Sequence, residues 1–90
     1  METILWNIGV EGAIAPSEPL PPPPEIPPGA VLVISGRAPI WRFGRALHLA
    51  HGSPAGAVAF FDPRLGGGVV VASHTPGVSE GDVVPLDNRE

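Results

Sequence analysis

Proline is concentrated in one stretch of this 90-residue chain, and that stretch divides the chain into parts that must fold differently. Eight of the 13 prolines lie in residues 15–29, which read APSEPLPPPPEIPPG. Proline has no backbone N–H and a fixed φ, so this stretch favours extended polyproline II geometry over a helix or an inner strand. The sequence therefore predicts an N-terminal edge strand in residues 1–14, a proline-rich connector in residues 15–29 and a core domain in residues 30–90.

The connector has two interpretations. As a semi-rigid linker it skirts the core and is dispensable for chemistry, whereas as an adaptor it is the ligand of a proline-recognising partner domain. Before it, residues 4–10 (ILWNIGV) alternate as a strand does, with Ile4, Trp6 and Ile8 on one face.

Length and composition exclude several classes of protein. A chain of this size buries only about 60% of its unfolded surface, so we expect it to self-associate. It has no cysteine, which excludes disulfides, thiolate metal sites and cysteine nucleophiles. No apolar run approaches the roughly 18 residues of a membrane span, and Glu2 stands where a signal peptide carries positive charge. These features predict a cytoplasmic protein.

Charge is segregated along the chain. Residues 29–79 contain four arginines and one acid, Asp62, for a net charge of +3, whereas the rest of the chain has a net charge of −7. All three histidines also lie in the basic segment. Since the planar guanidinium matches phosphate well, this segment predicts an anion-binding surface.

The core sequence predicts an α/β fold. Residues 31–35 are apolar without alternation, as in a central strand that is covered on both faces. Pro39 suits the first turn of a helix that ends near His51, and residues 57–61 form the next strand. The turn DPRLGG then leads into residues 68–73 as a hairpin. One βαβ unit plus one β-hairpin predicts a mixed sheet of four to five strands.

The predicted helix has two distinct faces. Apolar residues at spacings of three and four are expected to pack on the sheet, and these are Phe43, Ala46, Leu47 and Ala50. Gly44, His48 and His51 fall on an adjacent face. Gly44 is unfavourable in a helix and leaves a gap that a ligand or a partner subunit can enter.

Two strand ends carry candidate binding residues. In a βαβ unit ligands bind beyond the carboxyl ends of the parallel strands, here Ser35-Gly36-Arg37 and Asp62-Pro63-Arg64. The first segment leads into a helix N-terminus, which attracts phosphate. The alternative is ordinary turn chemistry, because glycine and Asp-Pro are both common in turns.

A metal site is a further possibility. His48 and His51 can converge on one ion, and Asp62 can join them if the following strand ends nearby. We expect the hairpin to bring His74 back to the end of the sheet that holds Asp62. This donor set suits manganese or another divalent cation, although each histidine alone is more often an ordinary surface or packed residue.

Four stretches resemble the small CRISPR-associated ring nucleases of the Csx-three (Crn-three) family, which are related to the CARF domains of type III CRISPR systems. In chain order they are VLVISGRAPIW, HLAH, VAFFDPRLGGGVVVASH and EGDVV. The resemblance implies a CARF-like domain that forms homodimers, which stack as a tetramer around the ligand. It implies manganese-dependent cleavage of cyclic tetra-adenylate, which damps antiviral signalling, with an active site shared between dimers and no DNA or membrane partner.

The resemblance also assigns roles to residues. It places catalysis on His51, Asp62 and Arg64, with metal binding by His48, His51 and Asp62. The ligand-binding residues that it implies are Ser35, Gly36, Arg37, Pro39, Trp41, Ser73 and His74.

The chemistry of such a ring is that of RNA, because each ribose 2′-hydroxyl can displace the neighbouring 5′-oxygen from phosphorus. Arg64 would stabilise the phosphoryl oxygens, Asp62 and histidine would hold the metal, and His51 would move the proton. A sensor that binds the ring without cutting it needs only the basic surface. A proline-rich adaptor needs only the connector.

Overall fold

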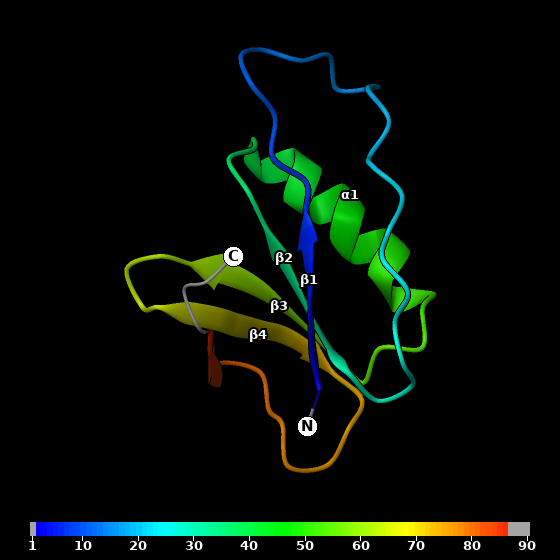
Figure 1. Cartoon of the computed structure of the whole chain (residues 1–90), viewed down its shortest axis with the longest axis vertical. Coiled ribbons are helices and arrows are strands. Elements are labelled where there is room, and N and C mark those ends of the chain that lie inside the picture. Colours follow the sequence, from blue (N-terminus) through cyan, green and yellow to red (C-terminus); the bar gives the residue numbers. More distant parts are fainter. Residues whose placement is uncertain (1, 87–90) are drawn as a thin grey trace.

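The computed structural model describes residues 2–86, which form a five-stranded sheet and one helix (Figure 1). The elements are β1 (Thr3–Asn7), β2 (Val31–Ser35), α1 (Ile40–His51), β3 (Ala57–Asp62), β4 (Gly67–Ser73) and β5 (Val83–Pro85). The strands lie in the sheet in chain order; β1, β2 and β3 are parallel, and β4 and β5 are each antiparallel to the strand before. The predicted α/β class and mixed sheet are confirmed.

β2 is the centre of the hydrophobic core. All five of its residues are buried, as its unbroken apolar sequence predicts, because both faces of the sheet are covered. Leu32 and Ile34 belong to the cluster beneath α1, whereas Val31 and Val33 belong to a cluster on the opposite face. The loop between β4 and β5 contributes Val78 to that second cluster.

α1 packs on the sheet through the predicted face. Ala46 and Ala50 are buried, while Phe43 and Leu47 are partly buried against the same cluster. The ring of Phe43 lies 5.2 Å from that of Phe60 on β3. α1 has 12 residues, and in the part of the chain that the structure describes no helix has the length and apolar character to cross a membrane.

The connector, residues 15–29, belongs to the crossover between the parallel neighbours β1 and β2 and lies beside α1 (Figure 1). A crossover of this kind is usually a helix. Here Ile26 is only 9% exposed, and both it and Leu20 join the core cluster beneath α1. The connector therefore does more than skirt the core, because its apolar side chains cover part of the sheet. That it is dispensable for chemistry stays a prediction.

Two arginines of α1 hold the connector in place. Arg42 is 3% exposed, and its Nη1 and Nη2 donate to the connector carbonyls of Glu18 and Pro19, each at 3.5 Å. Its Nε donates to the carbonyl of Ile8, which follows β1, at 2.9 Å. Arg45 Nη1 donates to the carbonyls of Pro16 and Glu18 at 2.9 and 2.8 Å. Because prolines offer carbonyl acceptors but no N–H donors, side-chain donors take the place of a strand ladder here.

Candidate functional site

The carboxyl ends of β1, β2 and β3 lie at one edge of the sheet because these strands are parallel. We call it the carboxyl edge; it includes residues 8–12, 35–39 and 62–66. Ile8 and Val10 continue the pairing beyond the strands, since their N–H groups donate to the carbonyls of Ser35 and Arg37, each at 2.8 Å. The loop that follows β2 is thereby held against the loop that follows β1.

Gly36 is required by this close contact. Its φ is 116°, and a Cβ at this position would collide with the backbone of Gly9 and with Asn7 Oδ1. The space that the missing side chain leaves is therefore filled by the protein itself. Gly36 fixes the direction of the loop that carries Arg37, and the interpretation of this glycine as turn chemistry is the one that the packing favours.

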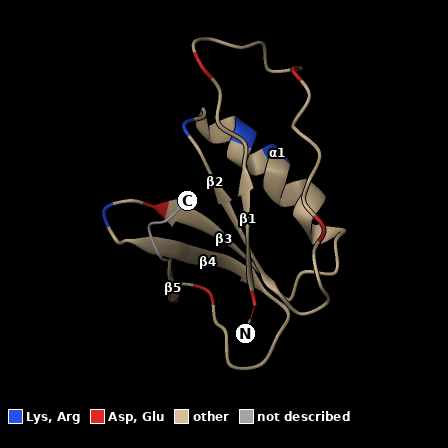
Figure 2. Cartoon of the chain, in the orientation of Figure 1, with Lys and Arg blue, Asp and Glu red and all other residues tan. Residues whose placement is uncertain are grey.

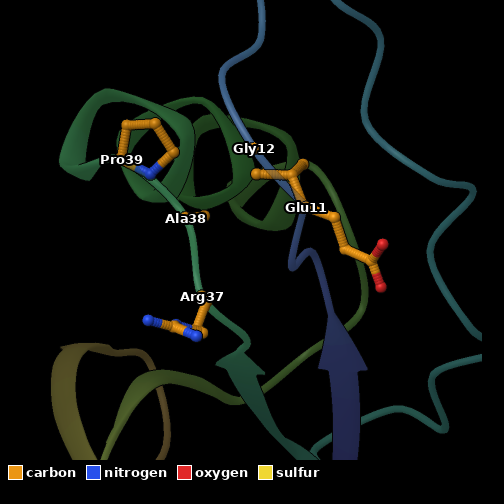
Figure 3. A pocket seen from close by; sticks show the side chains of 6 residues that line it. Glu11, Gly12, Arg37, Ala38 and Pro39 are labelled. Atoms are coloured by element: carbon orange, nitrogen blue, oxygen red, sulfur yellow. The ribbon is translucent and has the colours of Figure 1, made fainter.

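An open pocket of about 690 Å³ lies at this edge (Figure 3). Its lining comes from the segments after β1 and β2, namely Val10, Glu11, Gly12, Arg37, Ala38 and Pro39. The side chains of Arg37 and Glu11 point in opposite directions (Figure 3). Within residues 2–86 Arg37 has no salt bridge, so its exposed guanidinium is free to meet an anion.

The start of α1 adds positive potential beside Arg37. Pro39 is the N-cap and provides no side-chain hydrogen bond, and the first turn contains no acidic residue. The first N–H groups of a helix and the positive end of its dipole attract anions when no side chain satisfies them. This arrangement is consistent with the anion site that the sequence predicts between Ser35 and Pro39.

The four arginines of the basic segment differ in their contacts; two lie on α1 and two in loops (Figure 2). Arg42 and Arg45 are occupied by backbone carbonyls, as described above. Arg37 and Arg64 are exposed, and both lie at the carboxyl edge. The anion-binding potential of the segment is therefore concentrated at this edge.

Asp62 ends β3 and orients the turn that carries Arg64. Its Oδ1 accepts the Arg64 backbone N–H at 2.9 Å and lies 3.5 Å from Arg64 Nε. The hydrogen bond from this backbone N–H, and next the Arg64 side chain, hold the pKa of Asp62 below its ordinary value. At neutral pH Asp62 is therefore an ionised carboxylate and a weak base. The Arg64 side chain is 90% exposed and projects from the turn.

His74 lies at the opposite edge of the sheet, which we call the amino edge because the parallel strands begin there. Ala57 pairs with Ser73, whereas Asp62 pairs with Gly67. The prediction that the hairpin returns His74 to the end holding Asp62 is wrong, because β4 is antiparallel to β3 and ends where β3 begins.

The neighbour of His74 at the amino edge is His51. The His51 and His74 rings are 5.6 Å apart in an edge-to-face arrangement, and the His74 N–H donates to the Gly56 carbonyl at 2.8 Å. His51 is there because α1 runs antiparallel to the strands on which it packs, so it ends near the start of β3. Both histidines are exposed.

The predicted metal ligands do not meet within one chain. His48 and His51 lie toward the C-terminal end of α1, whereas Asp62 lies at the far end of β3, about 17 Å from its first residue at the usual rise of a strand. Among residues 2–86 no three His, Asp or Glu side chains gather as a possible metal site. A single chain therefore does not fit manganese through His48, His51 and Asp62, and we assign no chemical step to a metal.

The predicted ligand-binding residues fall into separate groups. Gly36, Arg37 and Pro39 lie at the carboxyl edge together with Ser35, which is only 8% exposed. Trp41 lines a different pocket, between α1 and the connector.

The other two predicted ligand-binding residues, Ser73 and His74, lie at the amino edge. The Ser73 hydroxyl donates to the Val78 carbonyl at 2.6 Å, so it shapes the loop before β5.

Sequence reasoning missed the segment from Val10 to Gly12 and the buried Arg42. The direction of β1 is the signal for the segment from Val10 to Gly12. Because β1 is parallel to β2, the residues that follow both strands lie at the same edge of the sheet. The signal for the second is the connector itself, whose many carbonyls need donors from elsewhere.

The fold and this edge define a small α/β domain that is suited to bind an anion beyond its parallel strands. The chain belongs to the family of the CRISPR-associated protein Cas_csx3, whose family model matches residues 8–85. The resemblance noted in the sequence is thereby confirmed at the level of the family. The chain is also 51% identical over 53 residues to a protein of Aquifex aeolicus (strain VF5) described as an uncharacterized protein; the match covers 59% of this chain and 46% of the Aquifex protein.

Proposed function

We propose that this protein is a ring nuclease that binds and cleaves cyclic tetra-adenylate and so damps type III CRISPR signalling. Membership of the CRISPR-associated family supports this, and so does the pair of exposed arginines at the carboxyl edge. A cyclic oligoadenylate presents phosphates around a ring, and Arg37 and Arg64 are both placed to meet them. Ring binding is therefore assigned to the carboxyl edge and its open pocket.

The observation that decides where the proposed active site forms is the separation of the predicted catalytic residues. Asp62 and Arg64 lie at one end of β3, and His51 lies with His74 at the other. One chain cannot bring both ends to the same phosphate. We assign the active site to a junction of two chains, in which the carboxyl edge of one faces the amino edge of another.

The family resemblance implies that dimers stack around the ligand. Such a junction can form between stacked dimers. A junction of two different surfaces is heterologous, so the same contact can repeat from one dimer to the next.

The reaction that fits these residues is internal transesterification. The ribose 2′-oxygen attacks the adjacent phosphorus, the bond from phosphorus to the 5′-oxygen breaks, and a linear product with a cyclic phosphate end is released. His51 takes the proton of the 2′-hydroxyl, and water supplies the proton that the leaving 5′-oxygen gains. Arg64 stabilises the negative charge on the phosphoryl oxygens, while the ionised Asp62 keeps Arg64 oriented.

A second candidate is a sensor that binds the ring without cutting it. One observation favours it: Asp62 Oδ1 already accepts a turn hydrogen bond, which is a sufficient structural reason for an aspartate at this position. In this candidate the ring still binds at the carboxyl edge, but no active site forms between two chains.

The test is incubation of the purified full chain with cyclic tetra-adenylate in the presence of manganese, of chelator, or of neither, followed by chromatography of the products. Linear oligoadenylate is expected in the presence of manganese. Binding of the ring without product at excess protein would favour the sensor, and absence of binding would overturn both candidates. Cleavage at full rate after exhaustive chelation would overturn the dependence on manganese that the resemblance implies.

A further inference from the structure

A second pocket, of about 480 Å³, lies on the outer side of α1. We call it the Trp41 groove. Its walls come from α1 and the connector, namely Leu20, Trp41, Gly44, Arg45, His48 and Leu49. It is mainly apolar with a few polar groups at its border, which is the usual character of a small-molecule site.

Gly44 is the unusual residue of this groove. Glycine is the poorest helix former after proline, and this one lies in the middle of α1. A Cβ at position 44 would meet no atom of residues 2–86 within 4 Å, and the backbone of Gly44 is not in the left-handed region. Contacts within this part of the chain therefore do not require the glycine. The open space above it is part of the groove, which Gly44 lines.

The charges around the groove indicate what that occupant is. Arg45 is fixed at the border by its hydrogen bonds to the carbonyls of Pro16 and Glu18, and His48 lies one turn further along the helix. None of the six lining residues is acidic. An electron-rich aromatic group fits such a border, because it offers acceptor atoms to Arg45 and His48 and a flat face to Trp41.

A second copy of the chain whose two-fold axis passed through the groove would fit it poorly. Each concave groove would then face another concave groove. Arg45 and His48 would also approach the same two residues of the other copy. Neither shape nor charge is then complementary.

We propose that the Trp41 groove binds a purine base, stacked on Trp41 above Gly44. The proposal rests on the proposed function, since it assigns an adenine of the ring to a place beside the carboxyl edge. Pro39 lines the first pocket and Trp41 lines the groove, with only Ile40 between them. The proposal places the phosphate of a bound nucleotide near Arg37 and its base in the groove.

Tryptophan fluorescence of the full chain during titration with AMP tests the proposal. The other tryptophan, Trp6, is 3% exposed, so quenching on binding reports on Trp41. We expect saturable quenching by AMP and none by ribose 5-phosphate. Gly44→Leu should weaken AMP binding by about tenfold or more, the effect of losing one stacked base. Ile40→Leu is the matched control, because Ile40 is 86% exposed on the same helix and does not line the groove.

The variants are expected to fold. Gly44→Leu should raise the melting temperature because leucine is a better helix former, and Gly44→Ala, which adds only a methyl group, is a second variant if leucine disturbs the helix. Unchanged AMP binding in both variants would overturn the groove, as would a change in oligomeric state without a change in AMP binding. Cleavage of cyclic tetra-adenylate by the unmodified protein then decides the proposed function separately: AMP binding lost in Gly44→Leu supports the groove even if the ring is never cut.

Discussion

The two edges of the sheet carry different kinds of chemistry. The carboxyl edge has two exposed arginines, one of them paired with an ionised aspartate, and an open pocket, whereas the amino edge has a pair of exposed histidines. Guanidinium groups, which suit an anion, are thus separated from imidazole groups, which can act as an acid or a base. Neither edge alone therefore holds all the residues of the proposed nuclease site.

The strongest way to test this division is to remove the charge of Asp62. Asp62→Asn keeps the turn but should lower the rate of ring cleavage by about 10²-fold or more, because Arg64 loses its orienting carboxylate. Ring affinity should stay within a few-fold. Rate and affinity are to be measured on one preparation, by product chromatography and by filter binding.

The matched control for that change is Asp82→Asn. Asp82 also accepts a turn hydrogen bond, from Ser79 N–H at 2.9 Å, but lies in the loop before β5. It should leave both rate and affinity unchanged. If Asp62→Asn weakens ring binding and ring cleavage in equal proportion, the claim that Asp62 affects the rate and not the affinity is wrong.

The arginines offer a second comparison, in stability. Arg42→Ala should lower the free energy of unfolding by about 2–4 kcal/mol, because the buried carbonyl of Ile8 loses its donor and the connector loses one of its two arginine anchors. Arg37→Ala should leave stability nearly unchanged and reduce ring affinity instead. Denaturant melts and binding measurements on both variants check this, and equal losses of stability would contradict the distinction between the two arginines.

The smallest expected effect concerns the titration of Asp62. Its lowered pKa means that ionisation stabilises the fold above the ordinary pKa of aspartate, and that this contribution is lost as the pH falls through the lower pKa of the folded state. Arg64→Gln should raise the pKa of Asp62 only in part, because the backbone N–H that is the main cause remains. Carboxyl chemical shifts measured from pH 2 to 6 would show it; a complete return to the ordinary value would mean that the side chain is the main cause.

Much of the fold follows from the sequence because its local signals agree. The apolar run of β2, the spacing of Phe43, Ala46, Leu47 and Ala50, and the DPRLGG turn each predict one element, and the βαβ rule sets the direction of its strands. The buried Arg42 was not predictable in this way. Its role depends on where the connector crosses the sheet, and no local pattern encodes that path.

The candidate site was predictable only in part. Arg37 and Asp62 follow parallel strands, so their shared edge follows from topology. The position of His74 follows only when the antiparallel direction of β4 is followed to the last residue of the strand. His74 then lies beside His51 instead of Asp62. The junction between chains lies beyond what the sequence of one chain specifies.

Mixing two inactive variants tests the central claim most directly. Asp62→Asn and His51→Ala should each cleave the ring poorly, while each retains one intact edge. If the site forms between chains, an equal mixture should recover about a quarter of the unmodified rate, since one junction in four then joins two intact edges. A mixture that stays as slow as the separate variants, with both folded and still able to bind cyclic tetra-adenylate, would contradict the shared site.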